Sequence, residues 1–184
     1  QNSGGSISAD TSATLNGTNT NGSFSIAGGS AVNMLLENGG YLSVNSGHQA
    51  TNTIINNSGR MNVEGSATNT TINSGGGLSV SGGGSTTNTT INSGGGLSVY
   101  GGASAVDITQ NSGGSISTDT SATLNGTNTN GSFSIAGGSA VNMLLENGGY
   151  LSVNSGHQAT NTIINNSGGM AVEFGGSATN TTIN

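Results

Sequence analysis

The sequence predicts an all-β protein, a parallel β-helix (β-solenoid) of about ten coils of roughly 18–19 residues each. Gly, Ser, Asn and Thr fill 115 of the 184 positions, so the chain has too few bulky side chains for a compact core. Turns of the form Asn/Ser-Gly return about every 18 residues, a regularity that a disordered polar polymer would lack. Short apolar alternation between these turns indicates strands, and no segment carries a helical period.

The recurring turn defines the repeat. Ser74, Ser93 and Ser112 begin three successive turns at equal intervals of 19 residues. The glycine of each turn supplies a positive φ and lets successive coils approach closely. The turns begin at Ser3, Asn21, Asn38, Ser58, Ser74, Ser93, Ser112, Asn130, Asn147 and Ser167.

A tandem duplication overlies the short repeat. Residues 1–64 match residues 110–173 at an offset of 109, and the match resumes after an inserted Phe174-Gly175. We therefore interpret 1–184 as a single solenoid domain, with duplicated segments 1–73 and 110–184 and regular 19-residue repeats between them. The matched segments differ only at Ala9/Thr118, Arg60/Gly169 and Asn62/Ala171.

The first half of each coil reads G-G-x-L-x-V, as in residues 75–80 and 94–99. Apolar residues two positions apart, with Ser between them, are typical of a strand with one buried face. The intervening serines are therefore expected to point outward.

The second half reads A-T-N-T-T-I, as in residues 67–72. We expect Thr68, Thr70 and Ile72 to point inward, because the equivalent places in other coils hold mainly apolar side chains. Those equivalents are Val32, Met34 and Leu36 in one coil, and Val106, Ile108 and Gln110 in another.

Two short strands in each repeat cannot form a stable unit alone, but stacking the coils about 4.8 Å apart satisfies the backbone. Stability would then come from main-chain hydrogen bonds and a thin apolar column. An asparagine recurs at one place in each coil and is expected to form a hydrogen-bonded amide ladder on the outside or at a bend, with contact to a ligand as the alternative. Its members are Asn33, Asn52, Asn69, Asn88, Asp107, Asn142, Asn161 and Asn180.

The charge pattern and residue inventory argue against several functions. The formal net charge is −6 with Arg60 as the single base, so nucleic-acid binding is not expected. With no cysteine, no G-G-x-G-x-D calcium motif and acids spread over different coils, we predict no metal site, no cofactor and no catalytic residues. His48 and His157 have no Asp placed to orient them and are expected to be solvated surface residues.

The alternation of I-N-S-G-G-x-L-x-V with G-x-x-A-T-N-T-x-I resembles the passenger repeats of self-associating autotransporter adhesins of the AIDA type. The resemblance implies a parallel β-helix exported through the periplasm and held at the bacterial outer membrane by a C-terminal translocator barrel that is absent here. It also implies adherence to host cells, autoaggregation and biofilm formation, and O-linked heptose on hydroxyls. The implied partners are the chain itself, a host cell-surface glycoprotein and a protein O-heptosyltransferase. A passive stalk that only spaces a distal binding domain from the membrane is the competing interpretation.

Under this resemblance the recurring serines become candidate glycan acceptors. A turn serine can equally accept a local hydrogen bond, and the two roles are compatible. The turn candidates are Ser3, Ser58, Ser74, Ser93, Ser112 and Ser167, and the strand candidates are Ser43, Ser79, Ser98 and Ser152.

Overall fold

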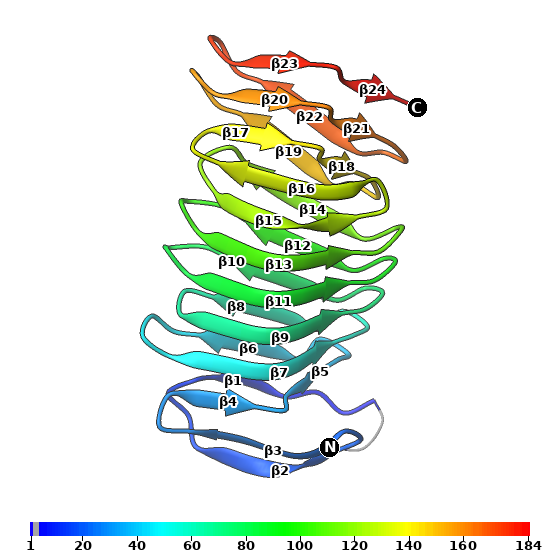
Figure 1. The fold of residues 1–184 in the computed structure, drawn as a ribbon. Helices are drawn as coiled ribbons and strands as arrows, with labels where there is room; N and C mark the ends of the chain where they lie inside the picture. Colours follow the sequence, from blue (N-terminus) through cyan, green and yellow to red (C-terminus); the bar gives the residue numbers. More distant parts are fainter. Residues whose placement is uncertain (2–3) are drawn as a thin grey trace.

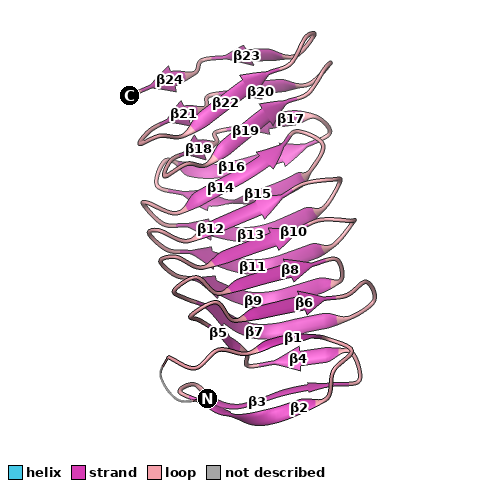
Figure 2. Cartoon of the chain, turned by 180° about the vertical axis from the view of Figure 1, so that it is seen from behind, coloured by secondary structure: helices cyan, strands magenta, loops and turns pink. Residues whose placement is uncertain are grey.

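The computed structural model describes residue 1 and residues 4–184 of the chain. In this part it consists of strands and turns with no helix (Figure 2). The strands stack along one axis, with one sheet on each side of a narrow interior (Figure 1). The predicted parallel β-solenoid is confirmed.

One side is an eight-stranded parallel sheet built from the L-x-V halves. Leu78 pairs with Met61 on one neighbouring strand and with Leu97 on the other, so equivalent positions align from coil to coil. In spatial order the strands are β1 (Ser8–Asp10), β6 (Tyr41–Val44), β8 (Arg60–Val63), β10 (Gly77–Val80), β12 (Gly96–Val99), β14 (Ser115–Asp119), β19 (Tyr150–Val153) and β22 (Gly169–Val172).

The opposite side is a 13-stranded sheet built from the T-x-I halves, continued by a small three-stranded sheet. The 13-stranded sheet contains, in order, β2 (Leu15–Asn19), β3 (Gly22–Ala27), β4 (Ser30–Val32), β7 (Gln49–Ile55), β9 (Ser66–Ile72), β11 (Ser85–Ile91), β13 (Ser104–Gln110), β15 (Thr123–Asn128), β16 (Gly131–Ala136), β17 (Ser139–Val141), β20 (Gln158–Thr160) and β23 (Ser177–Thr179). The thirteenth strand, β5 (Leu35–Leu36), pairs with β7 beside this path. The small sheet contains β18 (Leu144–Leu145), β21 (Ile163–Ile164) and β24 (Thr182–Ile183).

The interior is a thin apolar column between the two sheets. Leu42, Met61 and Leu97 enter it from the eight-stranded sheet, while Ile72 and Ile91 enter from the other side, and all five are buried. Main-chain hydrogen bonds between coils run beside this column, as in the bond of 2.9 Å from Asn73 N to Ile55 O. The fold therefore needs few large side chains, as the composition indicated.

The predicted coil number was too high, because the chain makes about eight coils. The turns beginning at Asn21 and Asn130 are the tips of antiparallel hairpins, β2–β3 and β15–β16, and do not lie at coil corners. Ser8 consequently pairs with Tyr41, which lies 33 residues farther along the chain. The Asn-Gly signature of a tight hairpin is the same as that of the corner turn, so sequence spacing alone counted both.

The predicted inward position of Thr68 was also wrong. Ala67, Thr70 and Ile72 are buried on β9, while Thr68 and Asn69 are both exposed. Asn69 has φ +56°, and this left-handed residue interrupts the strand's alternation. Two successive side chains therefore face outward before the alternation resumes at Thr70.

Candidate functional site

Two rows of asparagines run along the outside of the solenoid. We call the first the outer Asn row, and φ at its positions lies between +52° and +56°. It contains Asn33, Asn52, Asn69, Asn88, Asn142, Asn161 and Asn180, with Asp107 in place of an asparagine in one coil. Asn tolerates this left-handed backbone better than most residues, which accounts for its recurrence. Five of these amides donate to the side-chain Oδ1 of the preceding member, from Asn52 to Asn33 (3.2 Å), Asn69 to Asn52 (3.1 Å), Asn88 to Asn69 (2.7 Å), Asn161 to Asn142 (3.2 Å) and Asn180 to Asn161 (3.2 Å). Asn33 and Asn142 donate instead to the main-chain carbonyls of Ser23 and Ser132.

The outer Asn row is interrupted in the middle of the molecule. Asp107 continues the row in sequence, but an ionised carboxylate has no proton to donate to Asn88 Oδ1. The main-chain N–H of Asp107 donates instead to Asn125 Oδ1 at 2.9 Å, where the β15–β16 hairpin enters the sheet. A polar groove of about 590 Å³ lies at this break and includes Asn88, Asp107 and Asn142 in its lining.

The second row, which we call the corner Asn row, was missed by sequence analysis. The signal was present in the Asn that lies one position before Ser74, Ser93 and Ser112 and two positions before Ser58 and Ser167. Hydrogen bonds link Asn73 to Asn56, Asn92 to Asn73 and Asn111 to Asn92, each at 2.7 Å, and Asn184 to Asn165 at 2.8 Å.

The turn serines lie at the corners beside this row. The structure places Ser58, Ser74, Ser93, Ser112 and Ser167 at exposed positions, whereas Ser3 lies outside the described residues. Main-chain bonds stack these corners, from Ser58 N to Gly75 O (3.0 Å), Gly75 N to Gly94 O (2.9 Å) and Gly94 N to Gly113 O (2.8 Å). The backbone therefore holds the corners together and leaves the serine hydroxyls on the surface.

The strand serines are less accessible. Ser43, Ser79, Ser98 and Ser152 are half-buried on the outer face of the eight-stranded sheet. Ser79 and Ser98 are direct neighbours on β10 and β12. Ser43 Oγ donates to Asn45 Oδ1 at 3.4 Å and Ser152 Oγ to Glu173 Oε1 at 3.5 Å, so two of the four are in polar contact with other side chains.

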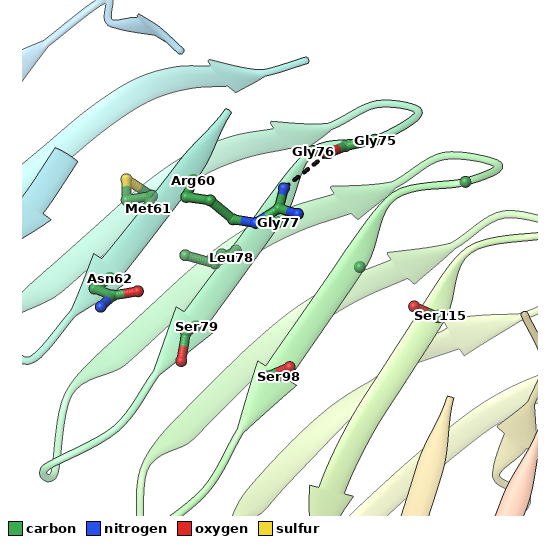
Figure 3. A pocket seen from close by; sticks show the side chains of 12 residues that line it. Arg60, Met61, Asn62, Gly75, Gly76, Gly77, Leu78, Ser79, Ser98 and Ser115 are labelled. Carbon is green, nitrogen blue, oxygen red and sulfur yellow. Dashed lines mark hydrogen bonds between the residues drawn. The ribbon is translucent and has the colours of Figure 1, made fainter. Parts of the chain in front are cut away.

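The same face carries a groove of about 410 Å³ around the only base of the chain (Figure 3). Arg60 lies at one end, and Gly77 and Gly96 form part of the lining on the next two strands. Ser79, Ser98 and Ser115 contribute hydroxyl groups. We call this feature the Arg60 groove; sequence analysis did not identify it.

The histidines are half-buried, contrary to the solvated positions expected for them. His48 Nδ1 lies 2.8 Å from the hydroxyl of buried Thr11, and that hydroxyl accepts a hydrogen bond of 3.1 Å from Asn45 N. The ring packs over Gly29, where a Cβ would come within 3.0 Å of it. His157 and Thr120 repeat the arrangement at 2.8 Å. Both histidines thus tie coils together.

Within residues 1 and 4–184, no group of three or more His, Cys, Asp or Glu side chains is placed to hold a metal ion. Burial raises the pKa of Tyr100, and the nearby carboxylate of Asp119 adds to the rise.

Comparison with known proteins assigns the repeat to a family. The model for AIDA, described as an adhesin of the bacterial autotransporter system and probable stalk, matches residues 16–76 and 125–184, together about two thirds of the chain. The chain belongs to this AIDA family. The resemblance noted from the repeats is confirmed, and an autotransporter adhesin stalk is a cell-surface, non-enzymatic protein, as expected.

Two curated relatives are also autotransporters. The chain is 75% identical over 57 residues to autotransporter CRAC of Citrobacter rodentium, a match that covers 30% of this chain and 4% of that protein. It is 63% identical over 57 residues to the autotransporter adhesin/invasin TibA of Escherichia coli O78:H11, covering 31% of this chain and 6% of TibA. The matches therefore span a small part of either relative.

A solved structure is also similar to the AIDA-family chain. The crystal structure of a TibC-catalysed hyper-glycosylated TibA fragment aligns with a TM-score of 0.46 and 30% sequence identity, covering 86% of this chain and 80% of that fragment.

In the described residues of the AIDA-family chain itself, no helix has the length and apolarity needed to cross a membrane.

Proposed function

We propose that the chain is an adhesive segment of a bacterial surface protein that carries O-linked heptose on its turn serines and mediates adherence to host cells and autoaggregation. The observation that carries the proposal is an exposed turn serine on each of several successive coils. Ser74, Ser93 and Ser112 occupy equivalent places, while Ser58 lies one position farther along its turn, in register with Gly75. A protein O-heptosyltransferase is the partner that would modify them. A second passenger and a host cell-surface glycoprotein are the partners that the modified surface would contact.

The geometry of the corners supports glycan attachment. A Cβ at Gly94 would lie 2.8 Å from Ser74 Oγ, and one at Gly113 would lie 2.5 Å from Ser93 Oγ. Glycine in the following coil therefore leaves room around the hydroxyls of Ser74 and Ser93. The half-buried strand serines offer a transferase less access, which ranks the turn serines ahead of them.

The sequence relation to TibA supports the same chemistry. TibA is named an adhesin/invasin, and the solved TibA fragment is described as hyper-glycosylated by TibC. Turn serines repeating about every 4.8 Å would carry a dense row of sugars. Many weak contacts on such a row would act together between two surfaces, so affinity would arise from multivalency.

Peptide mapping tests the acceptor assignment. The chain would be expressed in a host with and without a protein O-heptosyltransferase, and modified peptides would be sequenced by mass spectrometry. We expect heptose on Ser58, Ser74, Ser93, Ser112 and Ser167. The matched variants replace these five by Ala in one chain and the four strand serines by Ala in another. Undiminished modification of the first variant would reject the turn serines as acceptors.

The competing function is a passive stalk, which the family description "probable stalk" favours. A competition assay separates it from an adhesive segment. Purified, modified chain is added to bacteria that display the complete protein, and adherence and autoaggregation are measured. An adhesive segment reduces both by occupying partner surfaces, whereas a passive stalk leaves both unchanged.

A further inference from the structure

The Arg60 groove follows one line of aligned positions across the eight-stranded sheet. Tyr41, Arg60, Gly77, Gly96 and Ser115 occupy the same register position on five successive strands. An exposed aromatic ring and a guanidinium are thus followed by two positions without side chains and then by a hydroxyl. The positions from Arg60 to Ser115 line an open trough across the coils (Figure 3).

The guanidinium is held in position by the backbone. Arg60 Nη1 donates to Gly59 O at 2.9 Å and to Gly75 O at 2.8 Å. The side chain lies over Gly77, where a Cβ would come within 3.0 Å of Arg60 Cδ and 3.2 Å of Nε. Glycine at this position therefore allows the arginine to lie across the neighbouring strand instead of extending into solvent.

The positive charge of Arg60 has no acidic neighbour in the groove. Both acceptors of Nη1 are main-chain carbonyls, and no Asp or Glu occurs among the described residues that line the groove. An arginine has five N–H donors, so donors remain for an anion after the two carbonyl bonds. Its planar fork suits a carboxylate or sulfate group.

The remaining lining suits the hydroxyls of a sugar. Ser79 and Ser98 provide hydroxyls that can both donate and accept, and Ser115 Oγ, which donates to Gly95 O at 3.4 Å, can accept. At Gly96 an added Cβ would meet only Ser115 Oγ, at 3.2 Å, so this part of the trough is open. Its volume of about 410 Å³ falls in the usual range for small-ligand sites.

The duplicated copy shows that the fold does not require the arginine. Gly169 occupies the equivalent position on β22 and pairs with Tyr150, the counterpart of Tyr41. A Cβ at Gly169 would lie 3.1 Å from the Tyr150 ring, so the aromatic side chain covers this position. The same backbone therefore forms with either Gly or Arg at this position. The fold does not need the Arg60 side chain.

We propose that the Arg60 groove binds an anionic saccharide residue. The guanidinium pairs with the carboxylate or sulfate, the three serine hydroxyls hydrogen-bond the ring hydroxyls, and Tyr41 offers an apolar face at the edge of the site. This site goes beyond the proposed function and is independent of it, because recognition uses the bare chain and needs no attached heptose.

Direct titration of the unmodified 184-residue chain tests the site. The probes are sialyllactose, which carries a carboxylate, a sulfated disaccharide, and neutral lactose as control. We expect an anionic probe to bind, lactose to give no signal, and binding to weaken as salt is raised. Tighter binding of one anionic probe shows whether the groove prefers a carboxylate or a sulfate. Absence of binding by both anionic probes, or equal binding of lactose, would overturn the proposal.

Three variants connect binding to the groove. Arg60→Gly, which copies the residue of the second repeat, is expected to abolish binding while the circular dichroism spectrum stays unchanged. Arg60→Lys keeps the charge and is expected to bind about tenfold more weakly, as for one lost charge-assisted hydrogen bond. Gly96→Val fills the trough without touching Arg60 and is also expected to abolish binding. Wild-type affinity in either Arg60→Gly or Gly96→Val would contradict the assignment.

Discussion

Ser74 stands over Gly94 of the next coil, so closely that a Cβ at Gly94 would lie 2.8 Å from the serine hydroxyl oxygen. Gly94 also has φ +75°, a backbone conformation that side chains other than glycine rarely adopt. Two separate physical demands, backbone conformation and space around the hydroxyl, thus fall on one residue. Gly83 has almost the same φ of +78°, but a Cβ added there would meet no atom within 4 Å.

Replacing Gly94 by Ala is therefore predicted to cost more stability than replacing Gly83 by Ala. Both variants incur strain of about 1 kcal/mol from the positive φ. Gly94→Ala additionally displaces the Ser74 hydroxyl, and we expect this variant alone to lose modification at Ser74. Urea denaturation and peptide mapping measure the two effects. Equal destabilisation by the two substitutions would show that the hydroxyl moves aside without cost.

Buried threonines in the interior column give a second prediction. The hydroxyls of Thr53 and Thr70 are buried without a hydrogen-bond partner, whereas Thr89 Oγ1 lies 2.8 Å from Thr86 Oγ1 in a hydrogen bond. Thr53→Val keeps the shape and removes an unsatisfied group, so it should stabilise the chain by about 1 kcal/mol. Thr89→Val is the matched control and should destabilise it by a similar amount. The comparison is made by urea denaturation, and a destabilised Thr53→Val would contradict the prediction.

The parallel stacking could be predicted from sequence because the apolar pair of L-x-V returns after 17 or 19 residues in the regular coils, from Leu42 to Met61, Leu78 and Leu97. The two hairpins could not, since the segment from Asn19 to Gly22 carries the same Asn-Gly signature as a corner. Whether the chain continues around the coil or reverses depends on which neighbouring strand it pairs with. That pairing is a tertiary interaction, and the residues of the turn alone do not determine it.

The inward assignment of Thr68 failed for a different reason. Strict alternation was assumed along A-T-N-T-T-I, while the left-handed Asn69 interrupts it. The recurring Asn was itself the available signal, because Asn is enriched at positive φ. The Arg60 groove was harder to foresee, since its shape comes from missing side chains at Gly77 and Gly96 in other coils.

Tyr100 provides a test of pH dependence. Burial raises its pKa above the ordinary value of 10.0, with a further rise from Asp119. The folded chain then holds the phenolic proton more tightly than the unfolded chain, so this contribution to stability is complete below about pH 10 and is lost as pH rises through the folded pKa. Tyr100→Phe should reduce the loss of stability between pH 9 and pH 12, measured by urea denaturation. Asp119→Asn should lower the pKa of Tyr100 in an ultraviolet titration; an unchanged midpoint would remove Asp119 as a cause.

The break in the outer Asn row leads to the last prediction. At the Asn88–Asp107 step two acceptor groups follow one another, because the Asn88 amide nitrogen already donates to Asn69 Oδ1 at 2.7 Å. Asp107→Asn supplies the missing donor, and asparagine is compatible with the φ of +55° at this position. We expect the variant to be more stable by about 1 kcal/mol, the usual contribution of one hydrogen bond. Asn88→Asp is the reciprocal control: it removes the donor to Asn69 and places two carboxylates in succession, so it should destabilise the chain. The melting temperatures of both variants, measured by thermal unfolding, test this prediction. If the row only reflects the backbone preference of Asn, Asp107→Asn would leave the melting temperature unchanged.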